Sequence, residues 1–183
     1  MKHWLAWIGA SASLLGLPAL GQSSAAREAG GWGEVSAVLR HPRCMNCHTV
    51  TEFPRQGDDR HRHQQRVMRG PKGAGAATLQ CAACHQNSNS YDGKVPGAPS
   101  WHLAPLAMGW EKLNEAQLCA ALKDRAKNGN RSLEALVEHM TGDPLVQWAW
   151  APGARAAPPL PQAAFHGAVR RWAAEGARCP ATP

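Results

Sequence analysis

The chain contains Cys44-Met45-Asn46-Cys47-His48 and, further on, Cys81-Ala82-Ala83-Cys84-His85, two copies of the pattern Cys-x-x-Cys-His. Cysteines three residues apart lie on one side of a helical turn, where both thiols can form thioether bonds to the vinyl groups of one porphyrin. The adjacent histidine is then carried beneath the ring, where its imidazole can bind the iron. The repeated pattern therefore predicts two covalently attached haems, each held by two cysteines and one histidine.

The paired cysteines have two alternative interpretations. Two Cys-x-x-Cys pairs can form a structural zinc site, but the 33 residues between the pairs exceed the usual spacing, and zinc does not explain a histidine after each pair. A thioredoxin-like dithiol needs a strand-helix-strand context. The sequence offers no such context, so haem is the favoured interpretation.

The N-terminus indicates export. Lys2 and His3 precede an apolar run from Trp4 to Leu17, which is followed by Pro18 and the small residues up to Gly21. This pattern predicts a secretory signal peptide over residues 1–21, cleaved after Gly21. The alternative, a membrane anchor, needs about 20 apolar residues to span a bilayer. We expect a periplasmic protein with no stable membrane insertion, because no later stretch is long and apolar enough to be a transmembrane helix.

The mature chain is short and poor in large apolar side chains. After a flexible linker over residues 22–33, residues 34–183 have the size of one domain, a dihaem cytochrome c domain. The whole chain has only two Phe and one Tyr. Two porphyrins could supply the buried apolar surface that these side chains lack. We therefore expect an all-α fold, with short helices and long loops wrapped around two haems.

The C-terminal part has the clearest helical signals. Asn114 and Gln117 form a capping-box pattern at the start of a helix that ends before Asn128-Gly129. A second helix begins at Ser132 and stops at Thr141-Gly142, and a short third one follows Asp143-Pro144 through Trp150. The remaining predicted helices are 34–40 and 162–177. Between the motifs only 59–68 could hold a helix of any length, whereas 87–105 is predicted to be loop.

The charge balance is basic. Removal of Lys2 with the signal peptide leaves 19 basic and 13 acidic residues, and the surplus is concentrated between Arg55 and Lys72. No aromatic residue interleaves this cluster, so nucleic-acid binding is not expected. Three roles stay open for it: balancing haem propionates, steering an acidic redox partner, and forming a solvated face.

Cys119 and Cys179 are left over from the two motifs. In an oxidising compartment, an even number of remaining cysteines usually forms disulfides. The sequence therefore predicts a disulfide between the first C-terminal helix and the end of the last one. Two unpaired thiols, or ligation of iron by a cysteine, are the alternatives.

The sixth ligand of each iron decides what the protein can do. Besides His48 and His85, we predict His63 and His102 as metal ligands, because loop residues near a motif can be placed over a porphyrin. His61, His41, Met68 and Met108 remain possible. His139 and His166 are interpreted as ordinary helix histidines, since histidine is often partly exposed, and Met140 is interpreted as a core residue.

Several stretches together resemble a known family. They are His41-Pro-Arg-Cys-Met-Asn-Cys-His48, His61-x-His63, Arg69-Gly70, Cys81-x-x-Cys-His85, Gly97-Ala-Pro-Ser-Trp-His-Leu-Ala-Pro105, Asp143-Pro-Leu-Val-x-Trp-x-Trp-x-Pro-Gly153 and Cys179-Pro180. The chain resembles small periplasmic dihaem c-type cytochromes associated with isoquinoline oxidoreductase-type molybdenum hydroxylases. The resemblance covers nearly all of the mature chain, and it implies the role of an electron-accepting subunit.

The favoured function is electron transport rather than catalysis. We expect single electrons to pass through two covalent haem c groups, from a periplasmic dehydrogenase or molybdenum hydroxylase to a downstream cytochrome or oxidase. A peroxidase-like dihaem enzyme would need an iron with an open sixth position and an acid-base group beside it. A haem-based ligand sensor would need the same open position without turnover. Enough histidines lie near the motifs to saturate both irons, which favours the carrier.

Overall fold

A computed structural model describes residues 31–181 of the chain, so the predicted signal peptide and most of the predicted linker lie outside the described residues. The chain is mostly helical and its helices are short, as predicted. Among residues 31–181, no helix has the length and apolarity needed to cross a membrane. The main helices are α2 (Trp32–Leu39), α3 (Pro42–Met45), α4 (Glu115–Lys123), α5 (Leu133–Gly142), α6 (Pro144–Gln147) and α7 (Gln162–Ala174).

Local sequence signals explain where the C-terminal helices begin. The Asn114 side chain accepts a hydrogen bond from the Gln117 backbone N–H, and the Gln117 side chain accepts one from the Asn114 N–H, which is the predicted capping box of α4. Ser132 caps α5 in the same manner. Asp143 caps α6, where Pro144 occupies the first turn. These three helix starts are therefore confirmed.

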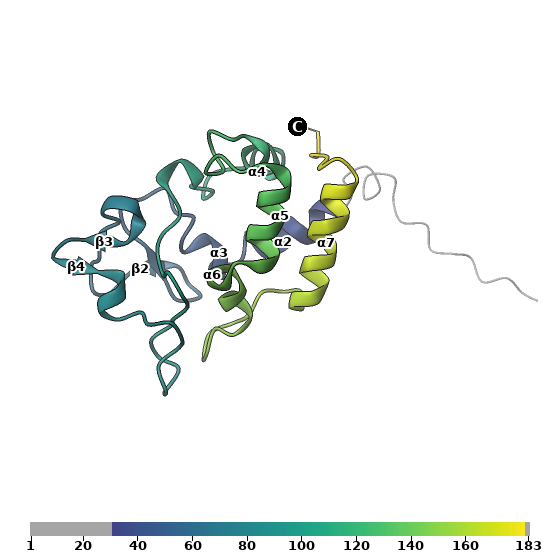
Figure 1. Ribbon diagram of the computed structural model, residues 1–183. Helices are drawn as coiled ribbons and strands as arrows, with labels where there is room; N and C mark the ends of the chain where they lie inside the picture. The colour runs from purple at the N-terminus through teal and green to yellow at the C-terminus, as the bar shows by residue number, and fades with distance from the viewer. Residues whose placement is uncertain (1–30, 182–183) are drawn as a thin grey trace, which may run out of the picture.

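All six of these helices lie in one half of the molecule, called here the helical half and comprising residues 31–45 and 108–181. α2 packs against α4 and α7, and α7 packs against α5 (Figure 1). Their facing sides hold the apolar core, whose largest fully buried side chains include Trp172, Phe165 and Leu118. α2 begins at Trp32, which is 2% exposed, so the helix starts two residues before the predicted position and the linker is shorter than expected.

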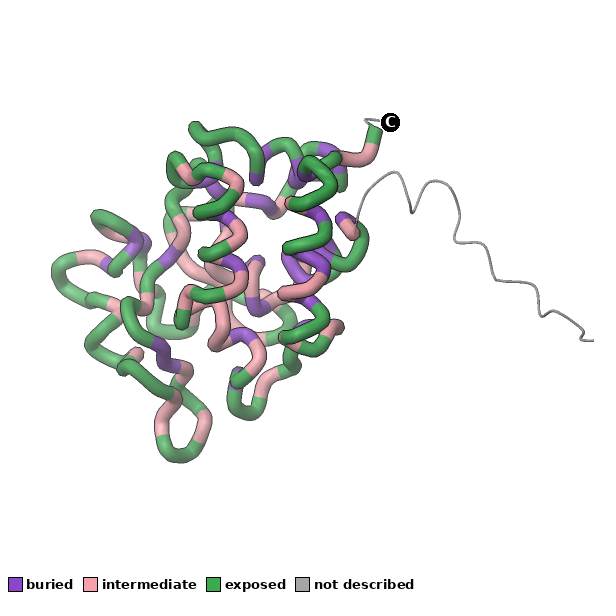
Figure 2. Tube along the Cα trace, turned by 45° about the vertical axis from the view of Figure 1, so that its right-hand side comes forward, coloured by how far each residue is buried: buried purple, intermediate pink, exposed green. Residues whose placement is uncertain are grey.

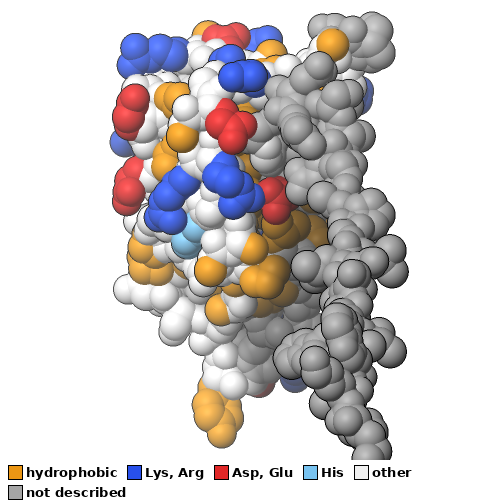
Figure 3. All heavy atoms as spheres, turned by 90° about the vertical axis from the view of Figure 1, so that its right-hand side faces the viewer, with side chains coloured by type: hydrophobic (Ala, Val, Ile, Leu, Met, Phe, Trp, Pro, Cys, Tyr) orange, Lys and Arg blue, Asp and Glu red, His pale blue; other side chains and the backbone are white. Residues whose placement is uncertain are grey.

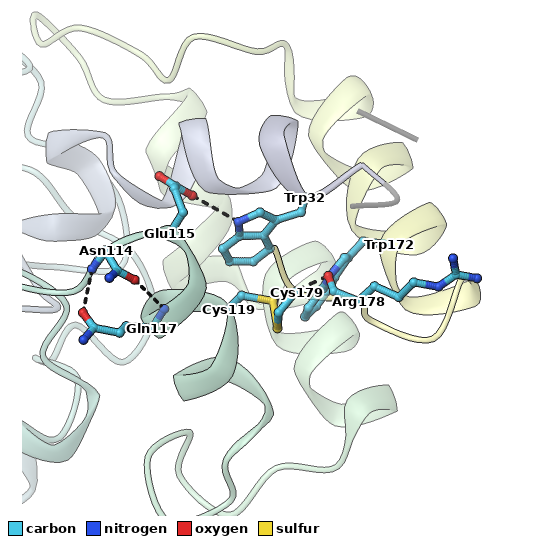
Figure 4. Close-up of a disulfide and its surroundings, with 8 residues drawn as sticks. All are labelled: Trp32, Asn114, Glu115, Gln117, Cys119, Trp172, Arg178 and Cys179. Carbon is cyan, nitrogen blue, oxygen red and sulfur yellow. Dashed lines mark hydrogen bonds between the residues drawn. A yellow bond between two sulfur atoms is a disulfide. The ribbon is translucent and has the colours of Figure 1, made fainter. Parts of the chain in front are cut away.

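The disulfide predicted between Cys119 and Cys179 is present, with 5.5 Å between the two Cα atoms. It joins the buried face of α4 to the segment that follows α7 (Figure 4). Beside it, the Trp172 indole N–H donates to the Arg178 carbonyl at 2.9 Å, and the Trp32 indole donates to Glu115 at 3.1 Å. The C-terminal segment is therefore tied to the core covalently and by a hydrogen bond.

Residues 46–107 form the second half, called here the loop half. Its regular structure consists of the two-residue strand pairs β1 (Arg55–Gln56) with β2 (His61–Arg62) and β3 (Gly75–Ala76) with β4 (Leu79–Gln80), and the 3-10 turns η1 (Pro71–Gly73), η2 (Cys81–Ala83) and η3 (Leu106–Met108). A fourth 3-10 turn, η4 (Trp148–Trp150), belongs to the helical half. Figure 2 shows that the buried segments are concentrated in the helices, whereas most of the loop half is exposed.

The stretch 59–68, where the sequence allows a helix, contains none. Residues 61 and 62 pair as a strand with 55 and 56, and both Arg60 and Arg66 adopt a positive φ, which an α-helix does not allow. Gly70 also has a positive φ, of +62°, and an added Cβ there would lie 2.0 Å from the Gly75 carbonyl oxygen, so only glycine fits at this position. The chain between the motifs is thus a set of tight turns rather than a helix.

The charged side chains are distributed differently on the two halves. On the face that carries α7, acidic and basic side chains are interspersed and apolar side chains gather below them (Figure 3). The basic surplus between Arg55 and Lys72 lies in the loop half, at the opposite side of the molecule in Figure 1. Glu111 binds two of these residues, Arg55 at 3.2 Å and Arg60 at 2.7 Å, so part of the surplus is neutralised within the chain.

Candidate functional site

The two Cys-x-x-Cys-His motifs have the same backbone hydrogen-bond pattern. In the first, the backbone N–H groups of Cys47 and His48 both donate to the Cys44 carbonyl at 3.1 Å. In the second, the N–H groups of Cys84 and His85 donate to the Cys81 carbonyl at 3.1 and 2.9 Å. Each motif is therefore one compact turn, which brings its two thiols and its imidazole to one side.

The two motif histidines are held in the same manner. The Nδ1 atom of His48 donates to the Met108 carbonyl at 2.9 Å, and that of His85 donates to the Pro96 carbonyl at 2.7 Å. A carbonyl can only accept, so the proton lies on Nδ1 and the Nε2 lone pair is left for a metal. A carbonyl partner of this kind is the usual support of a metal-binding histidine.

A tryptophan lies parallel to each of these imidazoles. The ring centres of His48 and Trp110 are 3.4 Å apart with 11° between the planes, and those of His85 and Trp101 are 4.6 Å apart with 8°. Burial lowers the pKa of His48 to about 3 and also lowers the pKa of His85. Both imidazoles are therefore neutral at pH 7 and fixed in orientation, as a metal ligand must be.

The motif thiols are not arranged as a redox dithiol. Burial raises the pKa of Cys44 to about 12 and that of Cys47 to about 11, and it also raises the pKa of Cys81. A catalytic dithiol needs the opposite shift, because the thiolate is the nucleophile. The environment of these cysteines thus disfavours the thioredoxin-like alternative.

Each motif faces its own cavity. The larger one, of about 590 Å³, lies between the two halves, and Cys44, Cys47 and His48 are in its wall. The smaller one, of about 290 Å³, is lined mainly by the loop half and has Cys81, Cys84 and His85 in its wall. The two cavities share part of their walls, namely Arg43, Cys47, Trp101, His102 and Trp148. Groups bound in the two cavities would therefore be close neighbours.

His63, predicted as a metal ligand, lies across the smaller cavity from His85. Their ring centres are 6.1 Å apart, with 74° between the planes. Two imidazoles that bind one metal ion from opposite sides, through metal–nitrogen bonds of about 2 Å, have ring centres about 6 Å apart. Burial lowers the pKa of His63, as does the nearby His85. The pair thus has the spacing of two axial ligands of one iron.

The other predicted ligand, His102, lies in the wall shared by the two cavities. It is an exposed residue, and its Nδ1 donates to the Ser100 carbonyl at 2.5 Å. The structure therefore places it near both motifs without pairing it with one of them.

The reserve ligands are placed less favourably. In the described part of the chain, His41, His61 and Met68 are not in the wall of either cavity. The His41 ring accepts from the Arg43 backbone at 3.3 Å, and His61 is bound to Asp59 at 2.6 Å. Met108 does line the larger cavity, but its carbonyl holds His48 on the Nδ1 side.

Sequence reasoning missed three features of the site. Trp110 and Trp101, which flank the motif histidines, lie 62 and 16 residues beyond them, so no local pattern could have revealed the pairing. His139, interpreted as an ordinary helix histidine, lies in the wall of the larger cavity. Its spacing of four residues from Asp143 was a usable signal, because residues i and i+4 meet on a helix. His166 does fit its interpretation, since it is bound to Gln147 at 2.8 Å.

Unsatisfied polar atoms gather around the cavities. Among residues 31–181, five buried side-chain atoms have no hydrogen-bond partner: Arg43 Nε, Asn46 Oδ1, Arg60 Nε, His63 Nδ1 and Arg69 Nε. All but Arg60 belong to cavity walls. Buried polar atoms are almost always paired, so such a cluster points to a bound group that completes it. A haem fits, because its propionates are acceptors for guanidinium N–H groups.

Exposed apolar side chains point to the same fit. The six large hydrophobic residues that are exposed all lie in the loop half: Val50, Met68, Leu79, Tyr91, Val95 and Leu106. Three of them, Leu79, Val95 and Leu106, line one of the cavities. A large apolar ligand bound there would remove these side chains from water. The polarity of the residues present therefore suits a porphyrin.

Within residues 31–181, no three His, Cys, Asp or Glu side chains are gathered as a site for a bare metal ion. A haem iron needs no such group, because the porphyrin supplies four ligands and the protein only the axial ones. Comparison with known families, curated proteins and solved structures found no match to this chain. Its function is therefore inferred from the geometry of its own residues.

Proposed function

We propose that this protein is a periplasmic one-electron carrier with two covalently bound haem c groups, one at each Cys-x-x-Cys-His motif. Cys44 and Cys47 would bind the first haem and Cys81 and Cys84 the second, with His48 and His85 as their axial ligands. The proposal is supported by the repeated motif and by the common geometry of its two copies.

The observation that carries the proposal is the distance of 6.1 Å between the ring centres of His63 and His85. Two histidines at this distance can occupy both axial positions of one iron, which leaves no position for a substrate. At the first motif, His102 and His139 both lie in the cavity wall as candidates for the second axial position. Saturated irons favour a carrier over the peroxidase-like and sensor alternatives.

Haem c supplies reversible one-electron chemistry at each site. The residues of the chain would position each haem, fix the tautomer of its histidine ligand and set the polarity around it. The carbonyls of Met108 and Pro96 hold the proton on Nδ1 and leave Nε2 free to bind. Burial keeps both imidazoles neutral by lowering their pKa. The indole rings of Trp110 and Trp101 pack against these imidazoles and keep water away from them. Arg43 and Arg69, which carry buried Nε–H groups, can balance the charge of propionates.

The shared wall of the two cavities supports electron passage in series. Trp148 and Trp101 line both cavities and touch each other edge to face, with ring centres 4.9 Å apart. An electron accepted at one site therefore has a short path to the other. The donor is proposed to be a periplasmic dehydrogenase or molybdenum hydroxylase, and the acceptor a cytochrome or oxidase, with the basic loop half facing an acidic partner.

A redox titration of the purified protein followed by its visible spectrum tests the proposal. We expect two one-electron steps, and a ferrous form that does not bind carbon monoxide at neutral pH. Hydrogen peroxide should be turned over no faster than by a mitochondrial-type cytochrome c used as a control. Rapid carbon monoxide binding by the wild-type protein would instead favour the enzyme or the sensor.

A further inference from the structure

We propose that His139, rather than His102, is the second axial ligand at the first motif, and that Asp143 is the positioning residue that holds its imidazole. This inference rests on the proposed function, because it assigns a ligand to a haem bound at that motif. It replaces a residue of an exposed loop by one on a packed helix.

The first support is the place of His139. It lies on α5, and its side chain is 20% exposed and forms part of the wall of the larger cavity, together with Cys44, Cys47 and His48. α5 is fixed by its Ser132 cap and by packing against α6 and α7. A ligand on a packed helix is positioned more accurately than one on a loop.

The second support is the bond between His139 and Asp143. The Nδ1 atom of His139 lies 2.9 Å from Asp143 Oδ2, which leaves Nε2 as the nitrogen not engaged by the carboxylate. The other carboxylate oxygen, Oδ1, accepts from the Leu145 backbone N–H at 2.9 Å, so the carboxylate is itself held in place. A histidine bound to a carboxylate in this way is the usual arrangement of a metal ligand. The Met108 carbonyl likewise accepts from His48 Nδ1 and leaves its Nε2 free.

The third support is that both imidazoles belong to the wall of one cavity. His139 and His48 line the larger cavity together with Arg131.

The competing side chains in this cavity are committed elsewhere. Met140, the next residue along α5, is 4% exposed and packs in the apolar core. Met108 holds His48 on its Nδ1 side, away from the nitrogen that would bind iron. His102 is exposed and belongs equally to the walls of both cavities. Both His102 and His139 have an anchored ring, but only the His139 side chain is largely shielded from solvent.

Substitution of His139 tests the inference through the spectra of the purified protein. His139→Ala should convert one of the two haems to a high-spin form that binds carbon monoxide, and added imidazole should restore the low-spin spectrum. His166→Ala is the matched control, because His166 is a helix histidine outside both cavity walls, and it should keep two low-spin haems. His139→Met fills a similar space and should keep six-coordinate iron, with a higher midpoint potential for that haem alone.

The variant Asp143→Asn tests whether Asp143 positions the His139 imidazole or only stabilises the fold. The amide cannot polarise the His139 N–H as a carboxylate does, so one haem should gain a higher midpoint potential while both stay low-spin. A change in folding stability alone would leave the potential unaltered.

The inference is overturned if His139→Ala and His139→Met leave both haems unchanged, or if His102→Ala produces the high-spin haem instead. That result would leave the proposed function standing, since the wild type would still carry two saturated haems. Wild-type protein without covalent haem would overturn both proposals.

Discussion

In the loop half, residues 46–107, only Ala98 and Leu103 are buried hydrophobic residues, whereas the single helix α4 buries five residues of its nine. The helical half is closed by a disulfide and by an apolar core that spans four helices. The loop half instead has two-residue strands, exposed apolar side chains and buried polar atoms without partners. One half thus carries its own apolar core, while the other has almost none of its own, as we expect if the proposed haems complete it.

This difference has an energetic consequence. A segment of this size buries so little of its own apolar surface that the free energy gained cannot offset the conformational entropy lost when the segment is ordered. A ligand that binds only the folded chain adds its binding free energy to the stability of the part that it contacts. We therefore expect haem attachment to control the order of the loop half and to affect the helical half much less.

The largest expected effect follows from removal of the second attachment site. In Cys81→Ser/Cys84→Ser, backbone amides of the loop half should exchange at nearly the rate of an unfolded chain, whereas amides of α4, α5 and α7 should stay protected. Hydrogen exchange followed by mass spectrometry measures both halves in one sample. Cys119→Ala/Cys179→Ala is the control that removes the same number of sulfur atoms. Full protection of the loop half in the serine variant would contradict the comparison.

Removal of the disulfide should instead destabilise mainly the helical half. Its closed loop spans 60 residues, so Cys119→Ala/Cys179→Ala should lower the free energy of unfolding of the helical half by about 4 kcal/mol in the chain-entropy model. Urea unfolding followed by far-ultraviolet circular dichroism measures this loss. The visible haem spectrum should not change, because neither cysteine lies in a cavity wall. A shift of that spectrum would show that the halves are coupled more tightly than proposed.

A smaller effect is expected at the cap of α4. Asn114→Ala removes the acceptor for the Gln117 N–H and should lower the free energy of unfolding by about 1 kcal/mol. Asn87→Ala makes the same chemical change at an exposed position of the loop half and should alter stability far less. Equal losses in the two variants would remove the capping box as a source of stability for the helical half.

The two halves also differ in how far the sequence predicts them. Caps at Asn114, Ser132 and Asp143 are local signals, and so the starts of α4, α5 and α6 could be read directly. The disulfide followed from the cysteines that the motifs leave over. The longer helices α4, α5 and α7 each bury an apolar face, which hydrophobic periodicity reveals.

The segment 59–68 shows why the loop half is harder to predict from sequence. It offers no apolar face at helical spacing, and side-chain contacts such as His61 with Asp59 favour turns instead. His63 could be chosen as a candidate because it lies near a motif, and its ring centre is 6.1 Å from that of His85. The place of His139 in the cavity wall could not be predicted, because the sequence of a helix shows its polar face without showing which cavity that face meets.

Haem content is the measurement that tests the central claim most directly. Protein exported with the c-type maturation system should have an intact mass equal to that of the mature polypeptide plus two haems. Both additions should survive extraction with acidified acetone, because thioether bonds hold them. Peptide mapping should locate one on Cys44 and Cys47 and the other on Cys81 and Cys84. A mature chain with four free motif thiols and no added mass, purified from cells in which a control cytochrome c is matured, would contradict the account.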